Sequence, residues 1–162
     1  MGNRELLLLL GAITIFGVLV SNTNRYMVEV KDVSMQREFT TYANSLAQSV
    51  IDEAKTKAYD GKVVGGSPPL PAGFTGHGAL GPEPGEVYPN FDDVDDYNGF
   101  TGADSLMLGD YSINVWVNYV NETTPDDSVH QKTFCKKMTV QVTSDYLNHP
   151  LETSYVFGYM KN

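Results

Sequence analysis

Four aspartates and one asparagine lie within residues 92–98, a segment dense in oxygen ligands. They are Asp92, Asp93, Asp95, Asp96 and Asn98. Calcium takes about six to eight oxygens from carboxylates, amides and backbone carbonyls. The spacing does not fit an EF-hand loop, because counting back from Gly99 places Val94 at the first ligand position. The segment therefore suggests calcium binding by an irregular loop, with a solvated acidic loop that favours solubility as the alternative.

A second carboxylate of interest, Glu5, lies directly before a long apolar run. Residues 6–20 read LLLLLGAITIFGVLV, without a charge and with Thr14 as the only hydroxyl. A membrane-spanning helix needs about 20 apolar residues, so the run is short, but its leucines still favour insertion. A carboxylate at the edge of hydrocarbon is costly unless it is paired. Glu5 therefore predicts a cationic partner, of which Arg4 is one, or a place among lipid headgroups.

Other kinds of chemistry find little support. The chain has 11 Lys and Arg against 20 Asp and Glu, a net charge of -9, whereas nucleic-acid binding needs a basic face. The fingerprints of serine hydrolases, phosphate loops and dinucleotide sites are absent. A lone cysteine, Cys135, excludes an internal disulfide, and His77, His130 and His149 have no metal-binding spacing. We therefore expect a protein that is not an enzyme and does not bind nucleic acid directly.

The apolar run of residues 6–20 is the first element of the chain, and three roles are considered for it. A cleaved signal peptide fits its length, but residues 21–24 contain no alanine for a cleavage site. A plain membrane anchor explains the run and the flanking Arg25, but not the position of Glu5. Packing among copies of the same helix explains both. The anchor and the helix-packing hypotheses both stay open at this point.

An amphipathic helix is predicted after the run, over residues 25–60. Proline is absent, and apolar residues recur at steps of three and four, which indicates one apolar face. That face comprises Phe39, Ala43, Leu46, Ala47, Val50, Ile51, Ala54 and Ala58. Gly61 after Asp60 is typical of a helix end. If this segment continues the helix of residues 1–24, one helix extends from near residue 2 to near residue 58.

A long loop is predicted for residues 61–109. This segment holds six of the eight prolines, and we expect its aromatic residues to pin it to the rest of the protein, with one short helix or strand within it.

Strands are predicted in the last third of the chain. Residues 110–162 alternate between apolar and polar, which predicts strands near 111–119, 134–142 and 153–160. An antiparallel meander needs a cover for its apolar face. The expected cover is Phe39, Leu46, Val50 and Ile51. The fold class is therefore α+β, a long N-terminal helix packed on a C-terminal antiparallel sheet of three to four strands.

This layout resembles the type IV pilin and pseudopilin superfamily. Glu5 before the run Leu6–Val20 carries the resemblance, together with the amphipathic continuation of the helix. The segment FDDVDDYNG over residues 91–99 is similar to an acidic motif common in bacterial pilin-like proteins. The architectural similarity covers the whole chain, whereas the motifs cover the first twenty residues or so and this loop.

The resemblance implies a structural subunit of a type IV pilus-like filament on the bacterial cell surface, held in the inner membrane before assembly. Its partners would be other copies of itself, the inner-membrane assembly machinery and a prepilin peptidase. Met1, Arg4 and Glu5 would direct assembly, with Glu5 neutralised by a neighbouring N-terminus or by Arg4. The filament core would be packed by Leu6, Leu7, Leu8, Leu9, Leu10, Gly11, Ile13, Ile15, Phe16, Gly17 and Leu19. The alternatives are a type II secretion pseudopilin and a monomeric, membrane-anchored periplasmic binding domain.

Overall fold

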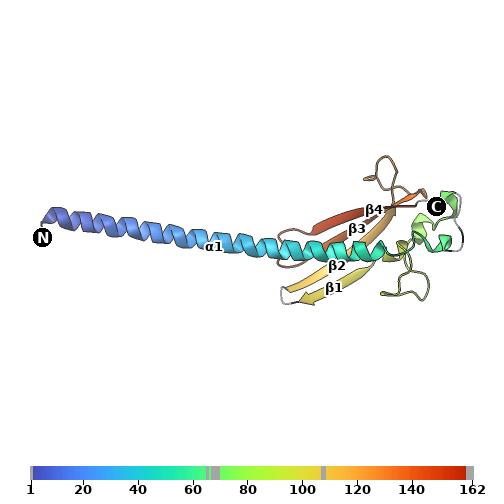
Figure 1. The fold of residues 1–162 in the computed structure, drawn as a ribbon, viewed down its shortest axis with the longest axis horizontal. Coiled ribbons are helices and arrows are strands. Elements are labelled where there is room, and N and C mark those ends of the chain that lie inside the picture. The colour runs from blue at the N-terminus through green and yellow to red at the C-terminus, as the bar shows by residue number, and fades with distance from the viewer. Residues whose placement is uncertain (1, 65, 67–69, 107–108, 160–162) are drawn as a thin grey trace. The chain divides into compact units, whose positions relative to one another are not determined.

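The computed structural model describes residues 2–64, 66, 70–106 and 109–159 (Figure 1). One long helix, α1 (Asn3–Ala54), leads into an irregular segment with short 3₁₀ helices, the last at Asp95–Tyr97. The strands that follow are β1 (Thr101–Leu106), β2 (Gly109–Tyr119), β3 (Cys135–Thr143) and β4 (Leu151–Gly158). The chain divides into two compact units, one ending at Glu38 and one beginning at Phe39, so the boundary falls within α1.

The first unit is the N-terminal part of α1. Gly11, Gly17 and the helix-poor segment at residues 21–24 all lie inside the helix without interrupting it. The Thr23 hydroxyl donates a hydrogen bond to the carbonyl oxygen of Leu19 one turn earlier, at 2.9 Å, so this polar side chain is satisfied within the helix. The apolar run and the residues after it therefore form one continuous helix, a point that the sequence left open.

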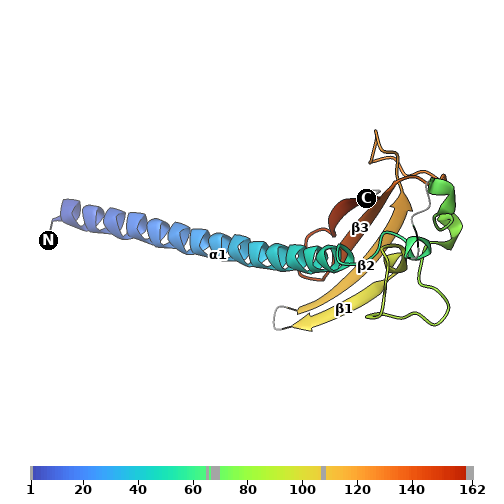
Figure 2. The same ribbon diagram turned by 45° about the vertical axis from the view of Figure 1, so that its right-hand side comes forward.

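The second unit contains an antiparallel sheet in the order β1-β2-β3-β4, each strand pairing with the next along the chain. Figure 2 shows β1, β2 and β3 side by side, and Figure 1 labels β4 next to β3. Residues 39–54 of α1 cover one face of this sheet, where Val115 of β2 and its register partner Val140 of β3 are buried. Phe39, Val50 and Ile51 are buried, and Leu46 is half-buried against the same core. The predicted α+β class, with the long helix packed on an antiparallel sheet, is confirmed.

The irregular segment is pinned to this unit, as its aromatic residues predict. Phe91 and Tyr97 are buried in the main core, and Phe74 is buried in a second cluster with Tyr119. Asn98 holds the segment to β2, because its side-chain amide donates to Leu80 O at 3.0 Å and its Oδ1 accepts Val117 N–H at 3.0 Å. The segment therefore presents its acidic residues from a fixed backbone.

Several boundaries differ from the sequence prediction. α1 ends at Ala54, not near residue 58, because Ala58 pairs its backbone with the acidic loop: Ala58 N–H donates to Asp92 O, and Val94 N–H donates to Ala58 O. Asp60 does not end α1 but caps the 3₁₀ helix Gly61–Val63. The predicted loop of residues 61–109 holds one strand, β1, and four 3₁₀ helices among its described residues. Tertiary pairing, which local periodicity does not report, sets these limits.

Candidate functional site

The apolar run of α1 is uncovered. Its large side chains from Leu6 to Val20 are between 45 and 75% exposed, and a Cβ at Gly11 or Gly17 would meet nothing within 4 Å. α1 contains one stretch long and apolar enough to cross a membrane. Exposed apolar surface on this scale marks a membrane or protein interface. The residues expected in a filament core are therefore all available for such an interface.

Glu5 caps the beginning of this surface. Its Oε2 accepts the Gly2 N–H at 3.3 Å, so the carboxylate satisfies one of the free N–H groups of the first helical turn. Within the described part of the chain, no ion pair joins Arg4 to Glu5. Met1, the third residue expected to direct assembly, lies outside the described residues. The cationic partner of Glu5 thus stays a prediction.

A second exposed apolar stretch follows on α1, and sequence analysis did not single it out. Its large apolar side chains are between 46 and 67% exposed: Tyr26, Met27, Val28, Val30, Val33 and Met35. Glu29, Lys31 and Asp32 are interspersed among them. A bilayer span of about 20 residues that begins at Leu6 ends near residue 25. This stretch therefore lies beyond what a membrane would cover.

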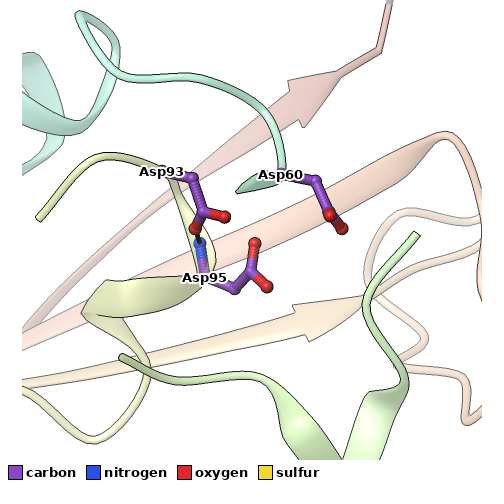
Figure 3. A group of neighbouring side chains, drawn as sticks. All are labelled: Asp60, Asp93 and Asp95. Atoms are coloured by element: carbon purple, nitrogen blue, oxygen red, sulfur yellow. Dashed lines mark hydrogen bonds between the residues drawn. The ribbon is translucent and has the colours of Figure 1, made fainter. Parts of the chain in front are cut away.

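The acidic loop of residues 92–98 is divided by the structure. Asp92 is exposed, Asn98 is half-buried, and Asp93, Asp95 and Asp96 are buried. Figure 3 shows Asp93 and Asp95 beside Asp60, with Asp93 Oδ1 accepting the Asp95 N–H at 2.7 Å. One carboxylate oxygen from each of these three aspartates lies within 4.8 Å of the other two. Burial of so much negative charge requires a cation.

Lys136 of β3 supplies that cation. Its side chain is fully buried, and its Nζ lies 3.0 Å from Asp60 Oδ2 and 2.5 Å from Asp95 Oδ1. The ammonium also donates to Tyr59 O at 2.8 Å and lies 4.5 Å from the centre of the Tyr59 ring. The sequence contained a sign of this burial. Lys136 lies two residues before Met138, so alternation along β3 places both side chains on the same, buried face of the sheet. The Asp60 cluster therefore holds its own cation, and Asp95 is committed to it.

The pKa values of the cluster follow from this arrangement. Burial opposes ionisation of Asp60, but the Thr75 N–H and the Lys136 ammonium outweigh it and lower the Asp60 pKa. Asp93 forms no ion pair with Lys136, and burial together with the neighbouring Asp95 and Asp96 raises its pKa to about 8. The negative charge next to Asp93 is thus only partly neutralised.

A second carboxylate group lies beside the first and includes two residues that sequence analysis missed. Glu83, Glu86 and Asp96 each offer a carboxylate oxygen within 4.8 Å of the others. Asp96 is 1% exposed; its Oδ2 accepts the N–H groups of Asp92 at 2.9 Å and Asp93 at 3.1 Å, while its Oδ1 has no hydrogen-bond partner in the described structure. The Glu86 hydrogen bond, burial and the Asp96 charge raise the pKa of Glu83 to about 7. This group lacks the cation that the first one has.

Two further side chains can be placed. His77 and His130 lie together, with their Nδ1 atoms 3.4 Å apart, although they are distant in sequence. No carboxylate or thiol joins them in a metal-like group among the described residues. Burial, with a smaller contribution from Glu122, raises the pKa of Cys135, which favours the unreactive thiol.

Comparison with known proteins adds no residue roles. No family model, curated protein or solved structure matches this chain. The resemblance to type IV pilins therefore rests on Glu5, the apolar run after it, the acidic segment of residues 91–99 and the layout of helix, loop and sheet.

Proposed function

We propose that this chain is a structural subunit of a type IV pilus-like filament, held in the inner membrane before assembly and on the cell surface afterwards. The observation that carries the proposal is the exposed apolar surface of α1, which lies in two stretches, Leu6–Val20 and Tyr26–Met35, separated by the polar residues 21–25. A membrane accounts for only the first part of it.

The two parts of this surface need different environments. Lipid can cover Leu6–Val20, where each buried leucine contributes about 1.5–3 kcal/mol relative to water. Tyr26–Met35 contains charged residues and cannot enter hydrocarbon at low cost. A second copy of α1 can cover both parts, because apolar residues pack together while charges stay at the rim. Self-association therefore accounts for the whole surface, which an anchor does not.

Glu5 gives such a bundle a fixed register. A carboxylate buried among apolar helices is very costly unless a cation pairs with it. Its bond to Gly2 N–H supplies a donor but no full positive charge. In an assembled bundle, the N-terminal amine or Arg4 of a neighbouring copy would complete the pair. Copies out of register would leave Glu5 unpaired, so the pairing selects one axial offset.

The test is electron microscopy of material sheared from cells without detergent, comparing the natural chain with Val30→Lys. Val30 is 49% exposed and lies beyond the membrane-spanning run. We expect filaments from the natural chain and a loss of at least about tenfold in filament yield for Val30→Lys, since a buried ammonium costs several kcal/mol. Membrane insertion, measured by fractionation, should be unchanged.

Val87→Lys is the matched control, because Val87 is 65% exposed and lies in the other unit. It should assemble normally. If the natural chain forms no filaments and is extracted only with detergent, the filament role is wrong and the anchored-domain or short-pseudopilin hypotheses replace it. Normal filaments from Val30→Lys would show that the second stretch is not part of the interface.

A further inference from the structure

We infer that Glu83, Glu86 and Asp96 form a binding site for a divalent cation of the calcium type. This inference does not depend on the proposed filament function. It replaces the broader ligand set suggested by the sequence, because Asp95 is paired with Lys136 and both polar groups of Asn98 are bonded to backbone.

The buried side chain of Asp96 is the first observation that points to a ligand. Asp96 is 1% exposed and its Oδ1 has no hydrogen-bond partner within the described residues. A buried carboxylate oxygen without a partner is costly, and native proteins rarely leave one unsatisfied. Because Oδ2 already accepts two backbone N–H groups, Oδ1 is left to bind a cation.

The placing of the two glutamates is the second observation. Glu83 and Glu86 each bring an oxygen within 4.8 Å of Asp96 and of each other. The turn that carries them is closed by the Glu83 N–H, which donates to Glu86 Oε2 at 3.1 Å. Glu83 is exposed and Glu86 is half-buried, so the group opens to solvent on one side. A cation can enter from that side and keep water molecules as its remaining ligands.

Further carboxylate oxygens lie close to the backbone at Gly61, beside Glu83. A Cβ at this position would lie 3.2 Å from Asp93 Oδ2, 3.7 Å from Glu83 Oε1 and 4.0 Å from Asp92 Oδ1. The absence of a side chain at Gly61 lets these oxygens converge. The exposed Asp92 therefore adds to the negative potential at the entrance of the site.

No protein cation neutralises this charge in the part of the chain that the structure describes. Lys136 is engaged by Asp60 and Asp95, and the ammonium of Lys57 donates to Phe91 O at 2.7 Å. None of the described ion pairs involves Glu83, Glu86, Asp92, Asp93 or Asp96. Hard carboxylate oxygens without nitrogen or sulfur donors favour calcium over zinc or copper. The neighbouring group of Asp60, Asp93 and Asp95 has the Lys136 ammonium as its cation, whereas Glu83, Glu86 and Asp96 have no such partner among the described ion pairs.

The experiment is a calcium titration of the full chain in detergent. Isothermal titration calorimetry measures the binding, and thermal unfolding measures the change in Tm. We expect one calcium bound per chain and a rise in Tm of about 5–10 °C at a concentration near 100 times Kd. The variant Glu83→Gln/Glu86→Gln should bind at least about tenfold more weakly. Both glutamates lie at the open side of the site, so this variant should fold.

Asp96→Asn provides an independent check on the buried ligand. The asparagine carbonyl can still accept the two backbone N–H groups, so the cation-free protein should be at least as stable as the natural one. Its Tm should no longer rise with calcium. Glu122→Gln, in the loop between β2 and β3, is the matched control and should bind calcium like the natural chain.

Two results would overturn the inference. The first is the absence of calorimetric heat and of any Tm shift for the natural chain at millimolar calcium. The second is unchanged affinity in Glu83→Gln/Glu86→Gln, which would move the site elsewhere. Filament formation by the same samples is scored separately, so failure of this site and failure of the proposed function are distinguishable.

Discussion

Lys136 is the residue on which the loop and the sheet depend together. It brings a full charge into the core, and that charge is balanced by Asp60 before the first 3₁₀ helix and by Asp95 in the acidic loop. The three groups come from distant parts of the chain. Removal of the lysine would leave two buried carboxylates without a cation, which is much worse than losing a hydrogen bond.

At this scale we predict that Lys136→Met lowers the free energy of unfolding by about 3–5 kcal/mol. Urea unfolding of the full chain in detergent measures it. Lys137→Met is the control, because Lys137 pairs with the fully exposed Asp126 at 3.2 Å, and such pairs contribute only ~0–1 kcal/mol. Adding Asp60→Asn and Asp95→Asn to Lys136→Met should restore part of the loss. Equal effects of the two lysine substitutions would contradict a buried ion cluster.

At the scale of elements, α1 is the feature to explain, because one helix serves two different surroundings. Up to Met35 its apolar side chains are exposed, whereas from Phe39 to Ala54 one face is buried against the sheet. The small residues Ala43, Ala47 and Ala54 are fully buried on that face, so the helix can approach the strands closely. Packing should therefore be tightest near these alanines.

We predict that Ile51→Ala costs about 2–5 kcal/mol of unfolding free energy, because Ile51 is 1% exposed and its removal leaves a cavity. Leu46→Ala should cost clearly less, since Leu46 is only half-buried. Both are measured by urea unfolding, with exposed Ser49→Ala as the control. A larger loss for Leu46 than for Ile51 would mean that α1 is rotated relative to the described packing.

At the scale of the whole molecule, the second unit has a buried core, whereas the first unit leaves its large apolar side chains exposed. The second unit has its own core, in which the helix face, the acidic loop and the sheet all contribute. The first unit has no buried apolar side chain among its described residues. Assembly and folding should therefore respond to different substitutions.

Glu5→Ala tests that separation. We predict that it abolishes filaments in sheared preparations, because the ion pair proposed to set the register could not form, while the Tm of the chain in detergent changes by less than about 2 °C. Glu122→Ala, an exposed substitution in the second unit, should leave both readouts unchanged. Filaments of normal length and number from Glu5→Ala would contradict the role proposed for this carboxylate.

The sequence already contained much of this description. Periodicity at steps of three and four placed the buried face of α1 at Phe39, Val50 and Ile51, and alternation placed the face of β2 that includes Val115 and Val117. The apolar run after Glu5 is visible without any structure. These features follow from local spacing, because helices and strands repeat with fixed periods.

Tertiary structure alone decided what the carboxylates do. Lys136 lies 76 residues from Asp60 and 41 from Asp95, so no local pattern joins them. The same applies to Asp96 and the pair Glu83 and Glu86, and to Ala58, whose pairing with Asp93 ends the helical region early. Contacts of this kind depend on strand register and on the path of the loop over the sheet. Both are fixed by burial summed over the whole core, which short-range spacing does not encode.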